Sequence, residues 1–247
     1  MDLLTDFNAA QIAFAFLAAF GAAFVRGLTG FGMAILLVPV LALTLNPVEA
    51  VLVVNGMSVL IGLSEIRRLV REAEVSAWWI SAACVALTPL GLFALAATGA
   101  DLARLIIALI ALSAFVAILL PHRGAAQPKA ATTATVGAIS GLMTGYAGMP
   151  GPPVVPYYVG RKMERETAKA SMLLIFTIAG AAGVVSAMAG GLLAWSHTAL
   201  SLLLFPATII GNWVGAKASG KISDPVWRTC VAAVLGAAAL AALVRLL

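Results

Sequence analysis

Apolar segments separated by short polar breaks follow one another along the whole chain and predict membrane-spanning helices. A helix needs about 20 apolar residues to cross a bilayer. The second and seventh of the ten segments are shorter, so we expect half-helices or re-entrant elements there, buried by neighbouring helices. The segments lie at about residues 7–25, 31–45, 48–66, 78–98, 102–120, 130–146, 151–159, 167–189, 198–217 and 226–247.

The composition excludes a soluble globular domain. Apolar residues make up 62% of the 247 residues and charged residues only 10%, whereas a soluble domain has about 25% charged residues. The start of the chain carries Asp2 and Asp6 but no basic residue, which argues against a cleavable signal peptide. The expected fold class is an all-α polytopic membrane protein with about ten membrane segments.

The lysines and arginines gather on one side of the predicted topology. If the ten segments alternate across the bilayer, only Arg104 and Arg245 of the 15 basic residues face the second side. Cytoplasmic loops carry the excess of basic residues, so we expect both termini in the periplasm. The net charge of +5 is therefore a sign of topology and not of a nucleic-acid partner.

A glycine-rich motif occurs twice, each time before one of the two short segments. Residues 27–32 read GLTGFG and residues 141–148 read GLMTGYAG, and a proline follows each motif after seven or eight residues. Irregular backbone within a membrane is tolerated only where protein or a water-filled cavity surrounds it. Two interrupted segments at matching places in two halves point to a transporter substrate site.

The two halves of the chain are expected to form an inverted repeat. Five crossings per half is an odd number, so the halves would enter the membrane from opposite sides. Further elements match in the same order: a Pro-Gly segment precedes Asp101 and Arg104 in one half and Asp224 and Arg228 in the other. The alternative is chance clustering of glycines. The expected parts are a first transmembrane repeat at 1–120, a cytoplasmic linker at 121–129 and a second, inverted repeat at 130–247.

The doubled glycine motif, the Pro-Gly segment before the last helix of each half and the sparse charge resemble the sulfite exporter TauE/SafE family, also called the toluene-sulfonate uptake permease group. The resemblance covers nearly the whole chain. It implies a carrier in the bacterial inner membrane for sulfur-containing anions such as sulfite, thiosulfate, sulfoacetate or other organosulfonates. The chain departs from the family after the first motif, where Met33, Ala34 and Ile35 replace a richer glycine run.

An anion in a membrane needs hydrogen-bond donors and positive potential, and the N-termini of half-helices supply both. Hydroxyls of the two motifs and polar residues in the segments at 48–66, 167–189 and 198–217 add donors. The alternative roles are helix packing, bonding to the residue's own helix backbone and, for Arg26, anchoring at the membrane surface. The candidate substrate-binding residues are Arg26, Thr29, Gly30, Gly32, Asn55, Ser58, Thr144, Gly145, Tyr146, Gly148, Ser171, Thr177, Asn212 and Trp213.

The remaining charged residues are interpreted as solvated. Glu49 and Glu65 lie near segment ends, where a solvated helix terminus is expected, and the runs at 67–74 and 161–169 are expected to be loops. No nucleophile–base pair and no metal-ligand spacing is found. The first glycine motif has the wrong order for a dinucleotide loop, and no P-loop lysine follows it. We therefore expect no enzyme activity, no cofactor and no bound metal.

The predicted function is secondary transport of the anion by alternating access. No ATP motif is found, so an ion gradient or the substrate's own gradient must drive the transport. A passive anion channel or a membrane-embedded interaction subunit is the alternative. The expected partners are the anion and membrane lipids, without nucleic acid. Two questions stay open: whether a proton or sodium ion is coupled, and whether the chain forms a homodimer.

Overall fold

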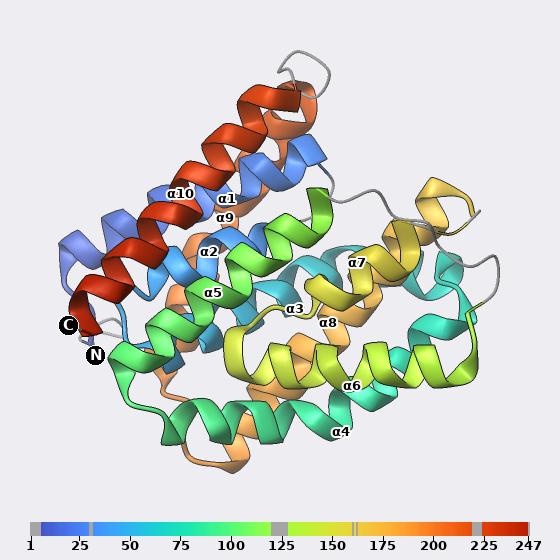
Figure 1. The fold of residues 1–247 in the computed structure, drawn as a ribbon, viewed down its shortest axis with the longest axis horizontal. Helices are drawn as coiled ribbons and strands as arrows, with labels where there is room; N and C mark the ends of the chain where they lie inside the picture. The colour runs from blue at the N-terminus through green and yellow to red at the C-terminus, as the bar shows by residue number, and fades with distance from the viewer. Residues whose placement is uncertain are drawn as a thin grey trace.

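The computed structural model describes residues 6–29, 32–119, 128–159, 161, 163–218 and 224–246, and these residues form an all-helical fold without strands. Their helices agree closely with the ten predicted segments (Figure 1). The helices are α1 (Ala9–Thr29), α2 (Met33–Leu41), α3 (Pro47–Glu72), α4 (Val75–Ala97), α5 (Ala100–Leu119), α6 (Ala130–Ala147), α7 (Gly151–Val159), α8 (Arg165–Ala189), α9 (Trp195–Ala218) and α10 (Asp224–Leu246).

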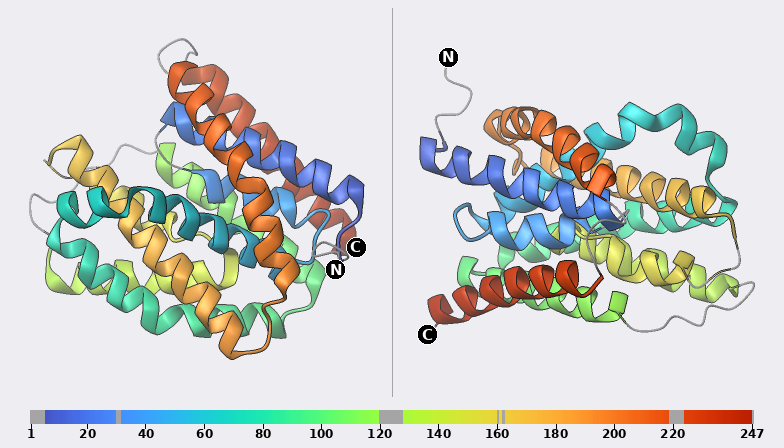
Figure 2. Two further views of the ribbon diagram at one scale, coloured as in Figure 1. Left: turned by 180° about the vertical axis from the view of Figure 1, so that it is seen from behind. Right: turned by 90° about the horizontal axis from the view of Figure 1, so that it is seen from above.

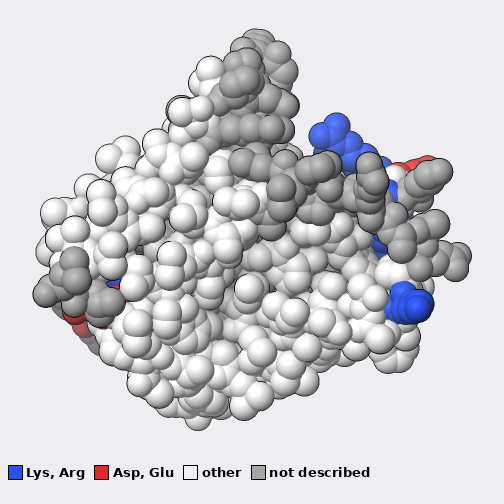
Figure 3. Space-filling view, in the orientation of Figure 1, with Lys and Arg blue, Asp and Glu red and all other residues white. Residues whose placement is uncertain are grey.

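The length and surface of the helices are those of a multi-pass membrane protein. Among the described residues, α1, α3, α4, α8 and α9 are long and apolar enough to cross a bilayer. Large apolar side chains such as Leu17, Trp79 and Val185 are exposed on the outside, as expected where lipid replaces water. In the space-filling view, lysines and arginines gather mainly at one end of the molecule, and the broad central face carries no visible charge (Figure 3).

Each glycine motif contains a glycine with a left-handed backbone at one end of a helix. Gly32, with φ of 95°, precedes α2, and Gly148, with φ of 65°, follows α6. Residues with a side chain rarely adopt this conformation, so glycine lets the chain turn sharply here. The two helices that follow, α2 and α7, have nine residues each, in agreement with the two short segments predicted.

Two helices extend beyond their predicted bounds, one at its end and one at its start, and both extensions contain charged residues. α3 passes residue 66 and ends at Glu72, and α8 begins at Arg165. Most of the runs at 67–74 and 161–169 are therefore helix ends, and the prediction of loops there was wrong. Glutamate and arginine are good helix formers, and Glu65 and Arg68 form an ion pair of 2.7 Å three residues apart, which supports the last turns of α3. Glu49, by contrast, caps the solvated start of α3 as expected.

The long helices pack in pairs across the two halves of the chain. α1 packs on α9, α6 on α4, α3 on α8 and α5 on α10. Figure 1 shows α1 and α10 on one side, α4 and α6 on the opposite side, and α2, α3, α5 and α7 between them, and Figure 2 shows α5 beside α10. The short helices thus lie within the bundle, and most of their residues are buried.

Glycines let two of these pairs approach until backbones touch. A Cβ atom added to Gly215 of α9 would lie 2.0 Å from the Phe24 carbonyl oxygen of α1, and one added to Gly145 of α6 would lie 2.1 Å from the Thr88 carbonyl oxygen of α4. Small residues at such contacts are typical of membrane helix interfaces. Gly145 lies inside α6, ahead of the helix end at Gly148, and its lack of a side chain serves packing.

Candidate functional site

A cavity of about 230 Å³ lies inside the bundle where the starts of α2 and α7 come close. Its walls are completed by α1, α3, α8 and α9. Residues 32–35 at the start of α2 and residues 149–151 at the start of α7 all line it. The two glycine motifs therefore direct two helix N-termini at one internal space.

The start of α2 supplies hydrogen-bond donors to this space. The first backbone N–H groups of a helix have no acceptor within it, and at α2 these belong to Met33, Ala34 and Ile35, which line the cavity. Gly32, the residue before them, makes no side-chain cap. At α7 two of the first residues are prolines, Pro152 and Pro153, which carry no N–H. Both helix dipoles favour negative charge here, but α2 is the richer donor.

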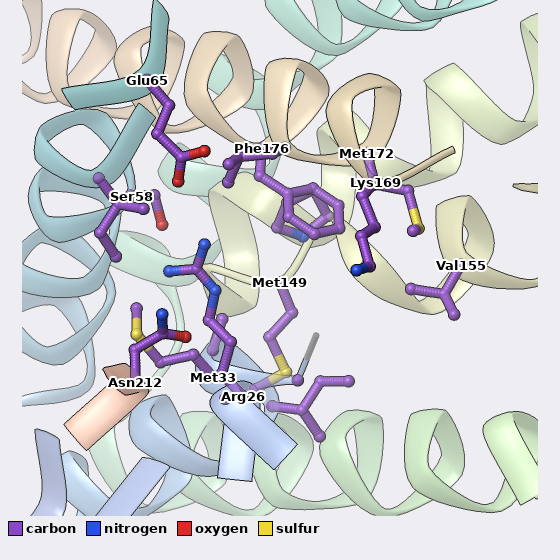
Figure 4. A pocket seen from close by; sticks show the side chains of 18 of the residues that line it. Arg26, Met33, Ser58, Glu65, Met149, Val155, Lys169, Met172, Phe176 and Asn212 are labelled. Atoms are coloured by element: carbon purple, nitrogen blue, oxygen red, sulfur yellow. The ribbon is translucent and has the colours of Figure 1, made fainter. Parts of the chain in front are cut away.

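Arg26 places a positive charge in the same space. It belongs to α1, lines the cavity and points its guanidinium group into it (Figure 4). Among the described residues it makes no hydrogen bond and no ion pair, and Glu65 is the charged group that acts on it. An arginine presents five N–H donors and binds oxyanions in a bidentate manner. Arg26 is thus a partly buried cation whose donors are available to a ligand.

A second group of charges lines the cavity from α3 and α8. Arg68 forms its 2.7 Å ion pair with Glu65 and a weaker one of 3.7 Å with Glu166. Lys169 lies 3.1 Å from Glu166. Arg68, Glu65 and Lys169 line the cavity, whereas Glu166 does not. The cavity wall therefore carries three cationic side chains and one carboxylate among the described residues, an excess of positive charge.

The rest of the wall is apolar. Met33, Met149, Met172 and Phe176 surround the charged groups, as Figure 4 shows. Methionine side chains are flexible and adapt to a ligand's shape. A few polar groups in an otherwise apolar cavity are typical of sites for small molecules. This cavity is therefore suited to a small anion.

Four of the residues predicted from sequence come together in the cavity, although they lie far apart in the chain. They are Arg26 of α1, Gly32 before α2, Ser58 of α3 and Asn212 of α9. The Asn212 side chain reaches into the space (Figure 4). Ser58 donates its hydroxyl proton to the Val54 carbonyl at 2.9 Å. Its oxygen therefore remains as a hydrogen-bond acceptor and not as a donor. Gly30, also predicted, lies outside the described residues.

The predicted threonines and serine bond to the backbone of their own helices. Thr29 donates to Val25, Thr144 to Ser140, Thr177 to Leu173 and Ser171 to Thr167, at distances of 2.6 to 2.9 Å. None of them lines the cavity. Self-bonding of this kind is common for hydroxyl residues inside helices. Ser171 also accepts the Glu74 N–H at 2.9 Å and thereby ties α8 to the start of α4.

The other predicted residues also lie outside the cavity wall. Asn55 is buried against Gly180 and Gly183 of α8. Tyr146 donates to Thr98 at 3.3 Å, and Trp213 is 57% exposed with Lys217 over its ring. Gly145 and Gly148 serve helix contact and helix termination, as described above. A substrate-binding role for these residues stays a prediction.

Sequence reasoning missed Glu65, Arg68 and Lys169. The signal available was that Glu65 and Arg68 stand three residues apart, which places them on one helix face if α3 continues. Nothing in the sequence places Lys169 of α8 beside them. No group of three or more residues suited to hold a metal ion is found in the described parts of the chain.

The geometry described so far is that of a membrane protein with a positively charged cavity beside the starts of two short helices. Comparison with curated proteins and with solved structures gave no match. Comparison with protein families gave a match over residues 15–242, nearly the whole chain, to the family described as Sulfite exporter TauE/SafE. This chain therefore belongs to the sulfite exporter TauE/SafE family of membrane transporters.

Proposed function

We propose that the chain is a secondary transporter that carries small sulfur-containing anions, such as sulfite, thiosulfate, sulfoacetate or another organosulfonate, across the bacterial inner membrane. The cavity is the proposed binding site. The observation that carries this proposal is Arg26, a cation without an ion-pair partner among the described residues, in a cavity that also receives the N-terminus of α2. A hydrogen bond to a charged group contributes roughly 1.5–3 kcal/mol, and this site offers several.

Alternating access requires two parts that move against each other around the site. We propose that residues 1–120 and 130–247 are inverted repeats that do so. The helix contacts support this. If α1 to α5 exchange places in order with α6 to α10, the α1·α9 pair becomes the α6·α4 pair and the α3·α9 contact becomes the α8·α4 contact. The α3·α8 and α5·α10 pairs stay the same under this exchange, and all of these contacts are present. The starts of the two short helices, which exchange with each other in this arrangement, both line the cavity.

The proposed orientation places the basic end of the molecule in the cytoplasm and both termini in the periplasm. Arg67, Arg68 and Arg71 at the end of α3 and Lys169 at the start of α8 belong to that basic end. The excess of positive charge on the cytoplasmic side is the general rule for membrane proteins. The cavity contains Arg68 and Lys169, so it is nearer the cytoplasmic end in this conformation.

Binding to the purified protein tests the proposed substrate class. Calorimetric titration with sulfite, thiosulfate, sulfoacetate, taurine and sulfate is expected to show binding of at least one sulfur anion. Arg26→Gln is expected to weaken that binding about tenfold or more, the equivalent of one charge-assisted hydrogen bond. Arg71→Gln is the matched control, because Arg71 pairs with the adjacent Glu72 alone among the described residues and its side chain is 79% exposed. Binding of none of these anions, or equal binding by the Arg26 variant, would overturn the site.

Counterflow in liposomes separates a carrier from a channel. A carrier exchanges labelled outside substrate for unlabelled inside substrate and saturates with concentration, because each cycle returns through the same site. A passive channel does neither. Linear, non-saturating flux without counterflow would overturn alternating access while leaving the anion site in place.

A further inference from the structure

The cavity contains one carboxylate among the described residues that line it, and that carboxylate lies where an anion would bind. Glu65 pairs with Arg68 at 2.7 Å, and it is the charged group that acts on Arg26 across the cavity. Figure 4 shows the Glu65 carboxylate and the Arg26 guanidinium pointing toward one another from α3 and α1. In the absence of an anion, Glu65 is thus the negative charge that faces both arginines.

The charges that face Glu65 come from three helices. Arg68 is on α3 itself, Arg26 is on α1, and Lys169 and Glu166 are on α8. The described cavity-lining residues of α2, α7 and α9 carry no charge. Glu166 pairs with both Arg68 and Lys169, whereas Glu65 pairs with Arg68 alone among the described residues. The Nε atom of Arg68 is buried and has no hydrogen-bond partner among the described residues. This arginine therefore has an N–H donor that is not in use.

An incoming anion and the Glu65 carboxylate would compete for the same cations. Two negative charges in one partly buried site repel each other, and this repulsion favours the neutral form of the group that can take up a proton. A proton from water converts the carboxylate to a carboxylic acid, removes the repulsion and frees Arg68 for the anion. By linkage, the anion and the proton then each strengthen the binding of the other.

We propose that Glu65 is the proton-binding residue of this transporter, so that one proton binds and moves together with each anion. This inference rests on the proposed anion site and adds to it the identity of the coupling ion and of its residue. It assigns to Glu65 a role in coupling and not a contribution to fold stability.

The test uses anions whose own charge does not change with pH. Methanesulfonate and sulfate stay fully ionised between about pH 5.5 and 8, so any pH dependence of their binding belongs to the protein. For wild-type protein we expect the affinity of the bound probe to rise as pH falls, by up to about tenfold per unit for one linked proton. Calorimetry in buffers of different ionisation enthalpy should show the uptake of up to one proton per anion.

Glu65→Gln removes the titrating group and keeps its shape. The variant is expected to bind the probe with an affinity that no longer changes with pH and without proton uptake. In proteoliposomes it is expected to keep counterflow but to lose the acceleration that a pH gradient gives to wild-type uptake. Glu65→Asp, which keeps the carboxylate, should restore the pH dependence. Glu166→Gln is the matched control: Glu166 touches the same Arg68 and Lys169 but does not line the cavity, so its variant should keep the pH dependence.

The outcomes separate the two proposals. A pH dependence that persists in Glu65→Gln, or that is absent from the wild type while the probe binds, overturns the coupling role and leaves the anion site intact. If neither probe binds wild-type protein at any pH, this inference is overturned. The proposed function then fails only if the wider set of sulfur anions does not bind either. If size exclusion shows that Glu65→Gln does not fold, two other measurements decide the coupling role. They are the pH dependence of anion binding by Glu65→Asp and the proton uptake of the wild type, measured in buffers of different ionisation enthalpy.

Discussion

Gly27 of α1 lies directly against the backbone of Asn212 in α9. A Cβ atom added to Gly27 would be 2.2 Å from the Asn212 carbonyl oxygen and 2.7 Å from the Ala216 nitrogen. Both Gly27 and Asn212 line the cavity. The first residue of the glycine motif therefore brings α9 close enough to complete the cavity wall. The last residue of that motif, Gly32, directs α2 at the space from another side.

Substitution of Gly27 by alanine is expected to destabilise the protein. The added methyl group meets backbone atoms, which cannot move aside as a side chain would, and overpacking of this kind costs about 1–3 kcal/mol. The thermal unfolding temperature in detergent should fall, and anion binding should weaken because α9 is displaced. Gly21→Ala is the control on the same helix, since a Cβ there has no atom within 4 Å, and it should leave the unfolding temperature unchanged or slightly raised. Equal behaviour of the two variants would contradict the close contact.

Substitution of Asn212 is expected to weaken anion binding, whereas substitution of Thr144 is expected to leave it nearly unchanged. Asn212→Leu removes an amide that reaches into the cavity, so anion affinity should fall about tenfold, the value of one hydrogen bond to a charged group. Thr144→Val removes a fully buried hydroxyl that bonds to Ser140 of its own helix, so affinity should change little. Calorimetry with the tightest-binding anion compares the two. Weaker binding in the threonine variant would instead support the prediction made from the glycine motif alone.

The helices could be predicted from the sequence more fully than the site. α7 begins at Gly151 and ends at Val159, as predicted, because the glycine-rich motif before it and the sequence Gly160-Arg161 after it interrupt the apolar pattern. Arg26, Gly32, Ser58 and Asn212 were found because a polar residue or a break within an apolar segment is costly and therefore conspicuous. Hydropathy could not reveal that α3 continues through charged residues, so Glu65 and Arg68 were assigned to solvent.

Other parts of the site depend on tertiary contacts that leave no local pattern. Lys169 of α8 meets Arg68 of α3 only through Glu166 and the packing of the two helices. Met33 and Met149 line the cavity but have the composition of any apolar segment. Thr144 was chosen for its match to Thr29, yet a hydroxyl inside a helix can satisfy its hydrogen bond within the same turn, and the motif does not indicate which way it points.

The ion pair of Glu74 and Arg161 is expected to make stability depend on pH. Arg161 donates to both Glu74 oxygens at 2.7 Å, and this lowers the pKa of Glu74 from its usual 4.5. A group with a lowered folded-state pKa stabilises the protein above its unfolded-state pKa, about 4.3. That contribution is lost as pH falls through the lower folded-state value.

Glu74→Gln should therefore lower the unfolding temperature at neutral pH, by an amount equivalent to about 1 kcal/mol for a partly exposed pair. The difference from wild type should close as pH is lowered below about 4. Glu72→Gln is the control, because within the described part of the chain Glu72 pairs only with the exposed Arg71 beside it. This variant should have a small effect at every pH. A difference between Glu74→Gln and wild type that stays constant down to acid pH would mean that the substitution acts through packing and not through the charge.

The orientation in the membrane can be tested at the two ends of α4. This helix has 23 residues, which span about 35 Å at 1.5 Å per residue and so can cross a hydrocarbon core of roughly 30 Å. Arg71 precedes it and Asp101 follows it, and both side chains are exposed, at 79% and 51%. In a background with Cys84 and Cys230 replaced by alanine, Arg71→Cys should react with a membrane-impermeant maleimide only after the cells are opened. Asp101→Cys should react in intact cells, because the basic end of α3 is the proposed cytoplasmic side. The reverse labelling pattern would invert the proposed orientation, and labelling of both sites from outside would mean that α4 does not cross the membrane.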